Sequence, residues 1–311
     1  MRWLRVIPKS CANVLWSALS SCARLALHLV SADSSQRAGA QQLREEFARI
    51  PLKVGEEKAV RGSWQSNRLR LRKEVLKRDP RAFLTWDVIR ETMFPPPYAG
   101  FARRELNFLK RQDWAVWRRV IKERPIGMPC PSVFYPLSSA NAIHHAYHLC
   151  RFEGETGLSI REFGTVVEFG GGYGSLCRIV HGLGFAGKYA IFDLPEQLAL
   201  QRYYLAALNL RNVLAISEIE LLGSVAETSR KPMLFVATWS LSESPLGLRR
   251  QVAQSVGRFD AFLIAYQSEF GGIDNVAFFR EWESWFPEVR WMRRTIEHVP
   301  ASTYLFGVRK R

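Results

Sequence analysis

The feature that most constrains the fold is a glycine-rich turn between an apolar run and a predicted helix. Residues 165–169 form a short β-rich run, and Gly170-Gly171-Gly172-Tyr173-Gly174 follows it directly. Glycines at 170, 172 and 174 allow a tight turn and let a ligand approach the backbone closely. A helix is predicted over 175–183. A strand, a glycine turn and a helix in this order predict an α/β fold that binds a ligand at the carboxyl end of the strand.

The second half of the chain alternates short β-rich runs with helical segments. Five runs separated by helices predict parallel strands joined by crossover helices. Two further runs, at 289–296 and 303–308, are joined by only six residues, which is too short for a parallel crossover. They are predicted to form an antiparallel hairpin at one edge of the sheet. The five parallel strands are predicted at 165–169, 188–192, 212–216, 232–238 and 260–265.

Composition excludes several classes of protein. The 311 residues are 47% hydrophobic and 23% charged, which is enough apolar chain for one sizeable core and excludes wholesale disorder. No uncharged apolar run approaches about 20 residues, so a polytopic membrane protein is excluded. The five cysteines show no CxxC pair and no cluster with histidine. This favours a reduced, cytoplasmic setting, and no metal site is predicted.

The net charge of +15 is concentrated in the first part of the chain. Residues 1–130 hold 26 Lys and Arg against 12 Asp and Glu, whereas residues 131–311 hold 18 against 17. Such an excess favours anionic partners, which include phosphorylated substrates, nucleic acid and an acidic membrane surface. The charge alone does not choose among them.

The chain before the glycine turn is predicted to consist of two parts. Residues 1–32 are predicted to form an amphipathic helix that docks on a membrane surface or a partner; a packing helix and a signal peptide are the alternatives, and Arg24 speaks against the latter. Residues 31–41 are interpreted as a linker. A basic helical accessory region over 42–124 follows, with helices at 67–77, 81–93 and 113–123. Four prolines and a glycine within 125–136 mark the start of a domain over 125–311.

Two acidic residues indicate what the glycine turn binds. Glu168 stands two residues before the first glycine, which is a poor position beside a pyrophosphate and a good one near a cationic ligand. Asp193 ends the second strand, where a carboxylate accepts hydrogen bonds from ribose hydroxyls. Ser175 occupies the position that a dinucleotide fingerprint gives to glycine or alanine, and the chain contains no GxxxxGK[ST] motif.

The segment over 168–174 resembles motif I of the class I S-adenosylmethionine-dependent methyltransferases, and Asp193 matches their ribose-binding acid. The longer run over 166–205, together with LFVATWSLSESP over 234–245, is similar to the sugar O-methyltransferase family. The resemblance covers about residues 125–311. It implies a Rossmann-like class I methyltransferase sheet, S-adenosylmethionine as cofactor, and a saccharide hydroxyl as acceptor. The cofactor-binding residues that it implies are Glu168, Gly170, Gly171, Gly172, Gly174, Asp193, Leu194, Trp239 and Ser240.

Methyl transfer to a hydroxyl requires in-line alignment and the removal of a proton. Glu243, after the fourth strand, is the first candidate for the base; the alternative is that it caps a helix beginning at Pro245. His145 is the second candidate, with an interface role for its histidine cluster as the alternative, and His298 is the third. The residues predicted to bind the acceptor are Asn141, His144 and Glu269.

The leading functional hypothesis is O-methylation of a nucleotide-, lipid- or glycan-linked sugar, as in polysaccharide biosynthesis. The alternatives are an RNA methyltransferase that uses the basic region, and a non-catalytic protein that binds cofactor or a partner. Nucleic acid is the less expected partner, because the chain lacks a recognisable RNA-binding motif. In addition, Pro95-Pro96-Pro97-Tyr98 lies upstream of the glycine turn, unlike the [DN]PPY signature of amino-group methyltransferases. A cytoplasmic location is expected, with peripheral contact to anionic membrane through residues 1–32.

Overall fold

The structure of the chain is a computed structural model that describes residues 34–51, 61–210, 212–228 and 232–310. The helix predicted over 1–32 lies outside the described residues. Among the helices that are described, none combines the length and the apolar character needed to cross a membrane.

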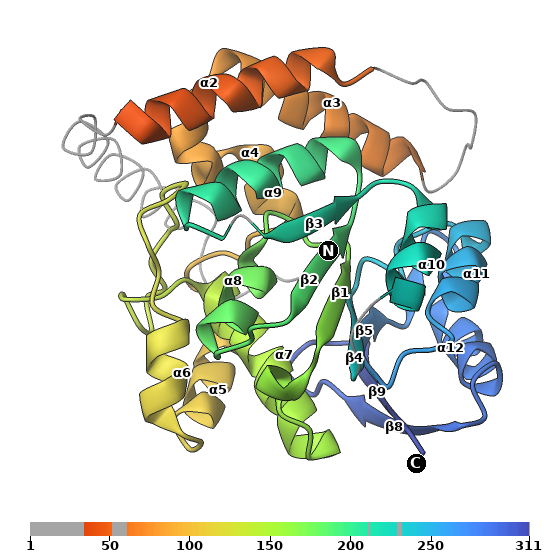
Figure 1. Ribbon diagram of the computed structural model, residues 1–311. Helices are drawn as coiled ribbons and strands as arrows, with labels where there is room; N and C mark the ends of the chain where they lie inside the picture. Colours follow the sequence, from red (N-terminus) through yellow and green to blue (C-terminus); the bar gives the residue numbers. More distant parts are fainter. Residues whose placement is uncertain (1–33, 52–60, 211, 229–231, 311) are drawn as a thin grey trace.

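A seven-stranded sheet forms the centre of the molecule, in the order β3-β2-β1-β4-β5-β9-β8 (Figure 1). Strands β1 to β5 are parallel, and β9 runs antiparallel to both β5 and β8. This confirms the predicted Rossmann-like class I methyltransferase sheet, with the hairpin at one edge. The last strand inserts beside β5, so β8 is the edge strand. The strands are β1 Thr165–Phe169, β2 Lys188–Phe192, β3 Val213–Ile216, β4 Met233–Thr238, β5 Ala261–Gln267, β8 Val289–Thr295 and β9 Ser302–Arg309.

Helices cover both faces of the sheet. Every residue of β1 is buried, as expected for a central parallel strand covered on both sides. Val166 packs with the helices of one face and Val167 with those of the other, since successive side chains alternate across a strand. On the first face lie α7 Ala140–Thr156, α8 Ser175–Gly182 and α9 Pro195–Ala207; on the second lie α10 Ile219–Thr228, α11 Leu246–Ser255 and α12 Asn275–Ser284. The short strands β6 Glu269–Phe270 and β7 Ile273–Asp274 pair with each other between β5 and α12.

The basic region is helical, with two corrections to the sequence prediction. The supposed linker is wrong from residue 34 onward, because α2 spans Ser34–Arg49 and its small, helix-compatible residues continue the pattern that follows. The single helix predicted over 81–93 is also wrong. A 3₁₀ turn, η1 Pro80–Thr85, is separated from α4 Asp87–Thr92 by Trp86, which is fully buried in an extended conformation. The remaining helices are α3 Arg61–Lys77, α5 Gly100–Leu109, α6 Trp114–Val120 and the short η2 Ile160–Glu162.

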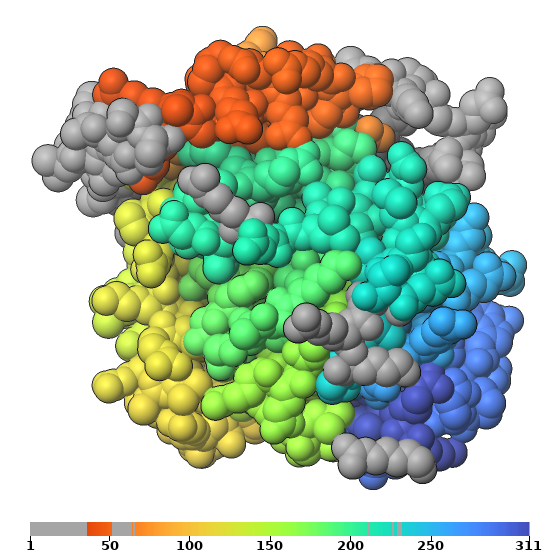
Figure 2. Space-filling model, in the orientation of Figure 1, coloured from red at the N-terminus to blue at the C-terminus, as the bar shows by residue number. Residues whose placement is uncertain are grey.

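These N-terminal helices share a hydrophobic core with the first face of the sheet. Phe47 of α2, Phe83 of η1 and Leu106 of α5 belong to the same buried cluster as Tyr204 of α9. In Figure 2 the orange surface of α2 lies directly against the green surface of α9, and Glu46 of α2 pairs with Arg202 of α9. The division into regions 42–124 and 125–311 therefore does not coincide with a division of the core.

Candidate active site

The glycine turn leaves β1 and begins α8 in a backbone conformation that side chains disfavour. Gly170 has φ +75°, and a Cβ there would lie 2.2 Å from the Cβ of Ser240. Gly172 has φ +56°, but a Cβ there would meet no atom closer than Met93 at 3.8 Å. The amide of Gly170 donates to the carbonyl of Phe192 (2.8 Å), which ties the turn to the end of β2. Glycine at 170 therefore permits the ends of β1 and β4 to pack closely, whereas glycine at 172 leaves space beside the turn.

A cleft of about 1870 Å³ opens over the carboxyl ends of the parallel strands. Pockets for one small ligand are usually about 300–1,000 Å³, so this one has room for two ligands side by side. The segment 93–101 of the basic region, which includes the Pro-Pro-Pro-Tyr run, forms part of its wall. Of the residues predicted from sequence, those that line the cleft are His145, Glu168, Gly170, Gly171, Gly172, Asp193, Leu194, Trp239, Ser240, Glu243, Glu269 and His298.

Three predicted site residues lie outside the lining of the cleft. Gly174 caps the N-terminus of α8 with φ +97° and packs against Leu205. The amide of Asn141 is buried and donates to the hydroxyl of Tyr173 (2.8 Å). The ring of His144 contacts a buried carboxylate, that of Glu105. The structure thus places these three where they support the wall of the cleft.

Two acids stand at the ends of β1 and β2. Glu168 is 3% exposed, and its Oε2 accepts a hydrogen bond from the hydroxyl of Tyr189 (2.8 Å). Asp193 accepts from the amide of Leu194 and from the side chain of Gln201, both at 2.8 Å. Burial raises the pKa of Glu168 to about 7, and proximity to Asp193 adds to the rise. Burial also raises the pKa of Asp193 to about 7, against the opposing effect of its hydrogen bonds.

These acids fit the cofactor that the sequence implies. A bound cation or a set of hydroxyl donors would stabilise the ionised carboxylates, which burial alone disfavours. Gln197 adds a polar atom to the same part of the cleft, because its Oε1 is buried without a hydrogen-bond partner among the described residues. Tyr189, Gln197 and Gln201 were not singled out from the sequence, since no motif distinguishes them from other residues of a buried strand and helix.

Glu243 also lines the cleft, from the turn that follows β4. Burial raises its pKa to about 7, against the opposing effect of a hydrogen bond from Nε2 of Gln267, 3.5 Å from Oε1. The helix α11 is capped at Pro245 with no side-chain hydrogen bond. The alternative reading of Glu243 as a helix cap is therefore wrong. A carboxylate with a pKa near 7 is suited to accept a proton at neutral pH.

The end of β4 is strained and anchored. Trp239 has φ +64°, which is rare for a residue other than glycine and costs free energy that the surrounding contacts must offset. Its ring stacks on that of His144, with centroids 5.3 Å apart and planes at 28°. The hydroxyl of Ser240 donates to the carbonyl of Phe169 and so joins the end of β4 to the end of β1. Ser240 faces the cleft, but its side chain is occupied by this contact.

The histidines of α7 differ in their surroundings. His145 lines the cleft, and its Nδ1 has no hydrogen-bond partner among the described residues. Burial lowers the pKa of His145 to about 3, and His144 and Arg178 lower it further, so its ring is neutral at pH 7. Such a group accepts a hydrogen bond readily but is a weaker base than Glu243 at neutral pH. His148 is fully buried and contacts the hydroxyl of Tyr304 away from the cleft.

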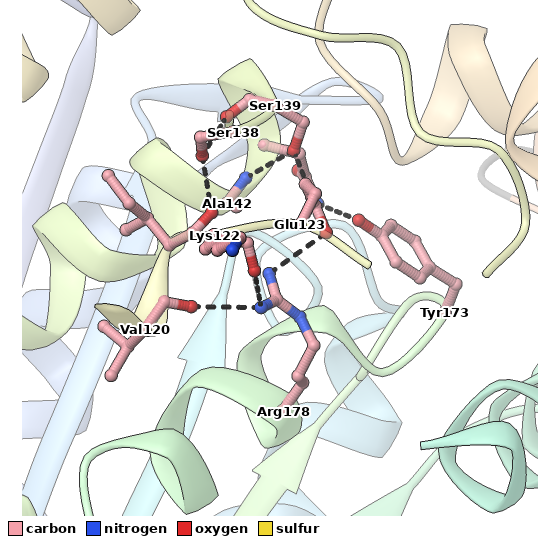
Figure 3. A network of polar contacts seen from close by, with 10 residues as sticks. Val120, Lys122, Glu123, Ser138, Ser139, Ala142, Tyr173 and Arg178 are labelled. Carbon is pink, nitrogen blue, oxygen red and sulfur yellow. Dashed lines mark hydrogen bonds and ion pairs between the residues drawn. The ribbon is translucent and has the colours of Figure 1, made fainter. Parts of the chain in front are cut away.

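A buried guanidinium fixes the helix that follows the glycine turn. Figure 3 shows Arg178 of α8 donating to the carbonyls of Val120 (3.0 Å) and Lys122 (3.2 Å), with the carboxylate of Glu123 3.4 Å away. Glu123 also accepts from Ser139, the N-cap of α7. The basic region is thus held to both helices that flank the cleft.

Glu105 is a buried acid beside the cleft that sequence reasoning did not single out. It lies on α5, is fully buried, and has both His144 and His298 within hydrogen-bonding distance. In the sequence it follows two arginines on a basic helix and has no distinguishing spacing. Only the packing of α5 on α7 buries it. Among the residues that the structure describes, no three His, Cys, Asp or Glu side chains are arranged to hold a metal ion.

No protein-family model matches this sequence, and a search of curated proteins finds no similar one. Solved structures resemble it at low identity. A fibrillarin pre-rRNA processing protein from Methanococcus jannaschii is 12% identical, covering 49% of this chain and 69% of its own, with a TM-score of 0.39. An O-methyltransferase family protein from Burkholderia thailandensis is 15% identical, covering 67% and 71%, with a TM-score of 0.40. A glycopeptide N-methyltransferase complexed with sinefungin is 16% identical, covering 52% and 85%, with a TM-score of 0.40. At these values, what those proteins bind or modify does not carry over to this chain.

Proposed function

We propose that this protein is an S-adenosylmethionine-dependent O-methyltransferase whose acceptor is a hydroxyl of a saccharide. The observation that carries the proposal is the set of residues that line one cleft. A glycine turn and two buried acids line one part of it, and Glu243, an acid with a pKa of about 7, lines another. The first set suits a cationic nucleoside, and the second suits a hydroxyl that must lose a proton.

The residues that would hold the cofactor come from the ends of β1, β2 and β4. Asp193 would accept hydrogen bonds from the ribose hydroxyls, Glu168 would favour the positive charge, and Gly172 would leave room beside the backbone. S-adenosylmethionine supplies a methyl group on a sulfonium. The chain's own part is to align the acceptor oxygen with that methyl, to exclude water, and to receive the hydroxyl proton on Glu243.

The saccharide is supported by the polar lining and by the sequence resemblance. Gln267, beside Glu243, and Glu269 also line the cleft, and they offer both acceptors and donors for a polyhydroxylated ligand. Trp239 adds an apolar surface for a sugar ring. The basic excess of residues 1–130 favours an acceptor that carries phosphate, as a nucleotide- or lipid-linked sugar does. Peripheral contact with anionic membrane through residues 1–32 is part of the same proposal.

Two measurements test the proposal. Calorimetric titration with S-adenosylhomocysteine should show micromolar binding, and NADH as control should not bind. Incubation with radiolabelled S-adenosylmethionine should then transfer label to a saccharide among UDP-glucose, GDP-mannose and lipid-linked glycans. Transfer to total RNA instead, with binding that weakens steeply as salt is added, would favour an RNA methyltransferase. Binding of the cofactor without transfer to either pool would favour a non-catalytic protein.

A further inference from the structure

Glu105 joins three elements at the wall of the cleft. Its Oε1 lies 2.7 Å from Nδ1 of His144 on α7 and 2.8 Å from Nε2 of His298, in the turn between β8 and β9. Its side chain is fully buried, and those of the two histidines are 13% and 9% exposed. One carboxylate oxygen from the basic region therefore fixes two rings from the sheet domain.

The charge of Glu105 determines which ring nitrogens carry hydrogen. Burial alone would raise the pKa of this carboxyl, but the adjacent rings of His144 and His298 lower it below its usual value. An ionised carboxylate only accepts hydrogen bonds, so the two nitrogens that contact it must donate. In a neutral imidazole only one nitrogen carries hydrogen. When the ring of His298 is neutral and its Nε2 donates to Glu105, Nδ1 is left as a bare acceptor.

Of these two histidines, His298 is the one that lines the cleft, next to Val299 and Pro300. Among the described residues, the hydrogen bond of this ring runs through Nε2 to Glu105, and none runs through Nδ1. Besides Glu105, the titratable groups that face His298 are Tyr147, whose ring centroid is 5.2 Å from that of His298, and His148. Burial raises the pKa of the Tyr147 phenol and lowers that of the His148 ring, so both groups are neutral at pH 7. The guanidinium of the nearby Arg151 donates hydrogen bonds to Tyr147 and Glu155.

We propose that Glu105 is a positioning residue that holds His298 in the tautomer protonated on Nε2, so that Nδ1 accepts a hydrogen bond from the acceptor's hydroxyl. The proposal rests on the function proposed above and specifies how its site selects a substrate. A bare ring nitrogen favours groups that donate hydrogen, such as hydroxyls. It disfavours carbonyl or phosphate oxygens at the same position, which have only lone pairs to offer.

The tautomer is measured directly in the full-length protein. Two-bond ¹H–¹⁵N spectra of the ¹⁵N-labelled chain, with the His298 signals assigned from a His298→Asn variant, should show Nε2 protonated and Nδ1 bare. Glu105→Leu should convert His298 to a mixture of tautomers, whereas Asp113→Asn, at the N-cap of α6 and outside the cleft, should change nothing. A wild-type His298 protonated on Nδ1 would overturn the proposal even if Glu105→Leu does not fold.

A second measurement tests whether His298 contacts the acceptor. For the saccharide found by the transfer assay, His298→Ala and His298→Gln should raise the acceptor KM at least tenfold. His298→Asn, which places an amide atom near the Nδ1 position, should retain more affinity. The affinity for S-adenosylhomocysteine should be unchanged in all three. If the wild-type chain does not bind S-adenosylhomocysteine, the proposed function fails while the tautomer measurement stands; normal acceptor KM values in the His298 variants would refute the acceptor contact alone.

Discussion

At the scale of single residues, Asp193 is the acid whose role in cofactor binding is most easily isolated. We expect Asp193→Ala to weaken S-adenosylhomocysteine binding by about 1.5–3 kcal/mol, because charged hydrogen bonds to the ribose are lost. Calorimetric titration measures this, with Asp113→Ala at the N-cap of α6 as a control outside the cleft. Unchanged affinity in a folded Asp193→Ala protein would remove this residue from the site.

Glu243 sets the expected pH dependence of the reaction. Its pKa is raised to about 7 by burial, and the base must be ionised to receive a proton. Turnover should therefore rise with pH and reach half its plateau near pH 7. Glu243→Gln should abolish this dependence and reduce kcat by about 10²–10⁴-fold, with cofactor affinity nearly intact. A variant that keeps both its rate and its pH profile would exclude Glu243 as the base.

At the scale of elements, the glycine turn offers a matched pair of substitutions. Both Gly170 and Gly172 have positive φ, so alanine at either position costs about 1–2 kcal/mol of backbone strain. Only at Gly170 would the new Cβ also collide with Ser240, which adds about 1–3 kcal/mol. Urea unfolding should therefore find Gly170→Ala less stable than Gly172→Ala. Equal stabilities would mean that the ends of β1 and β4 separate easily.

The strands were predictable because their signal is local. β1 and β2 have the predicted bounds, since each is an uninterrupted β-rich run that ends in a turn or in Asp193-Leu194-Pro195. The N-terminal helices were less predictable. The break at Trp86 follows from burial of that side chain against other elements, and α2 is stabilised by packing on α9. Neither contact is visible in a short window of sequence.

The same distinction holds for the site. The turn at 170–172 and Glu168 belong to one continuous motif, and Asp193 ends the next strand, so spacing alone predicted that these residues share one cleft. Glu105 reaches the cleft wall from 39 residues before His144 and 193 before His298. Its role depends on how α5 packs on α7, which pattern and composition do not encode.

At the scale of the whole molecule, the raised carboxyl pKa values predict how stability varies with pH. Glu168, Asp193 and Glu243 each have a folded pKa of about 7, above the unfolded value, so the stability they contribute when protonated is lost as pH rises through 7. His145 and His148, whose pKa values are lowered by burial, have the opposite effect on stability. They reduce it mainly below about pH 6.5, where their imidazoles take up protons in the unfolded chain. Without ligand, the free energy of unfolding should fall by on the order of 1–2 kcal/mol between pH 6.5 and 8.

Calorimetric melting at the two pH values checks this sign. Glu243→Gln, which removes one of the three carboxyls, should reduce the difference. A melting temperature that is higher at pH 8 than at pH 6.5 would contradict the raised pKa values of these three carboxyls.

The position of β8 at the edge of the sheet has a consequence for self-association. An edge strand presents unpaired backbone groups to which a strand of another molecule could bond. β8 carries Arg290, Arg293 and Arg294, of which the latter two pair with Glu283 and Glu155 of the same chain. A second copy aligned along this edge would bring arginines together and would have to displace those pairs. The opposite edge, β3, spans only Val213–Ile216. Both borders of the sheet thus carry features that disfavour the pairing of strands between molecules.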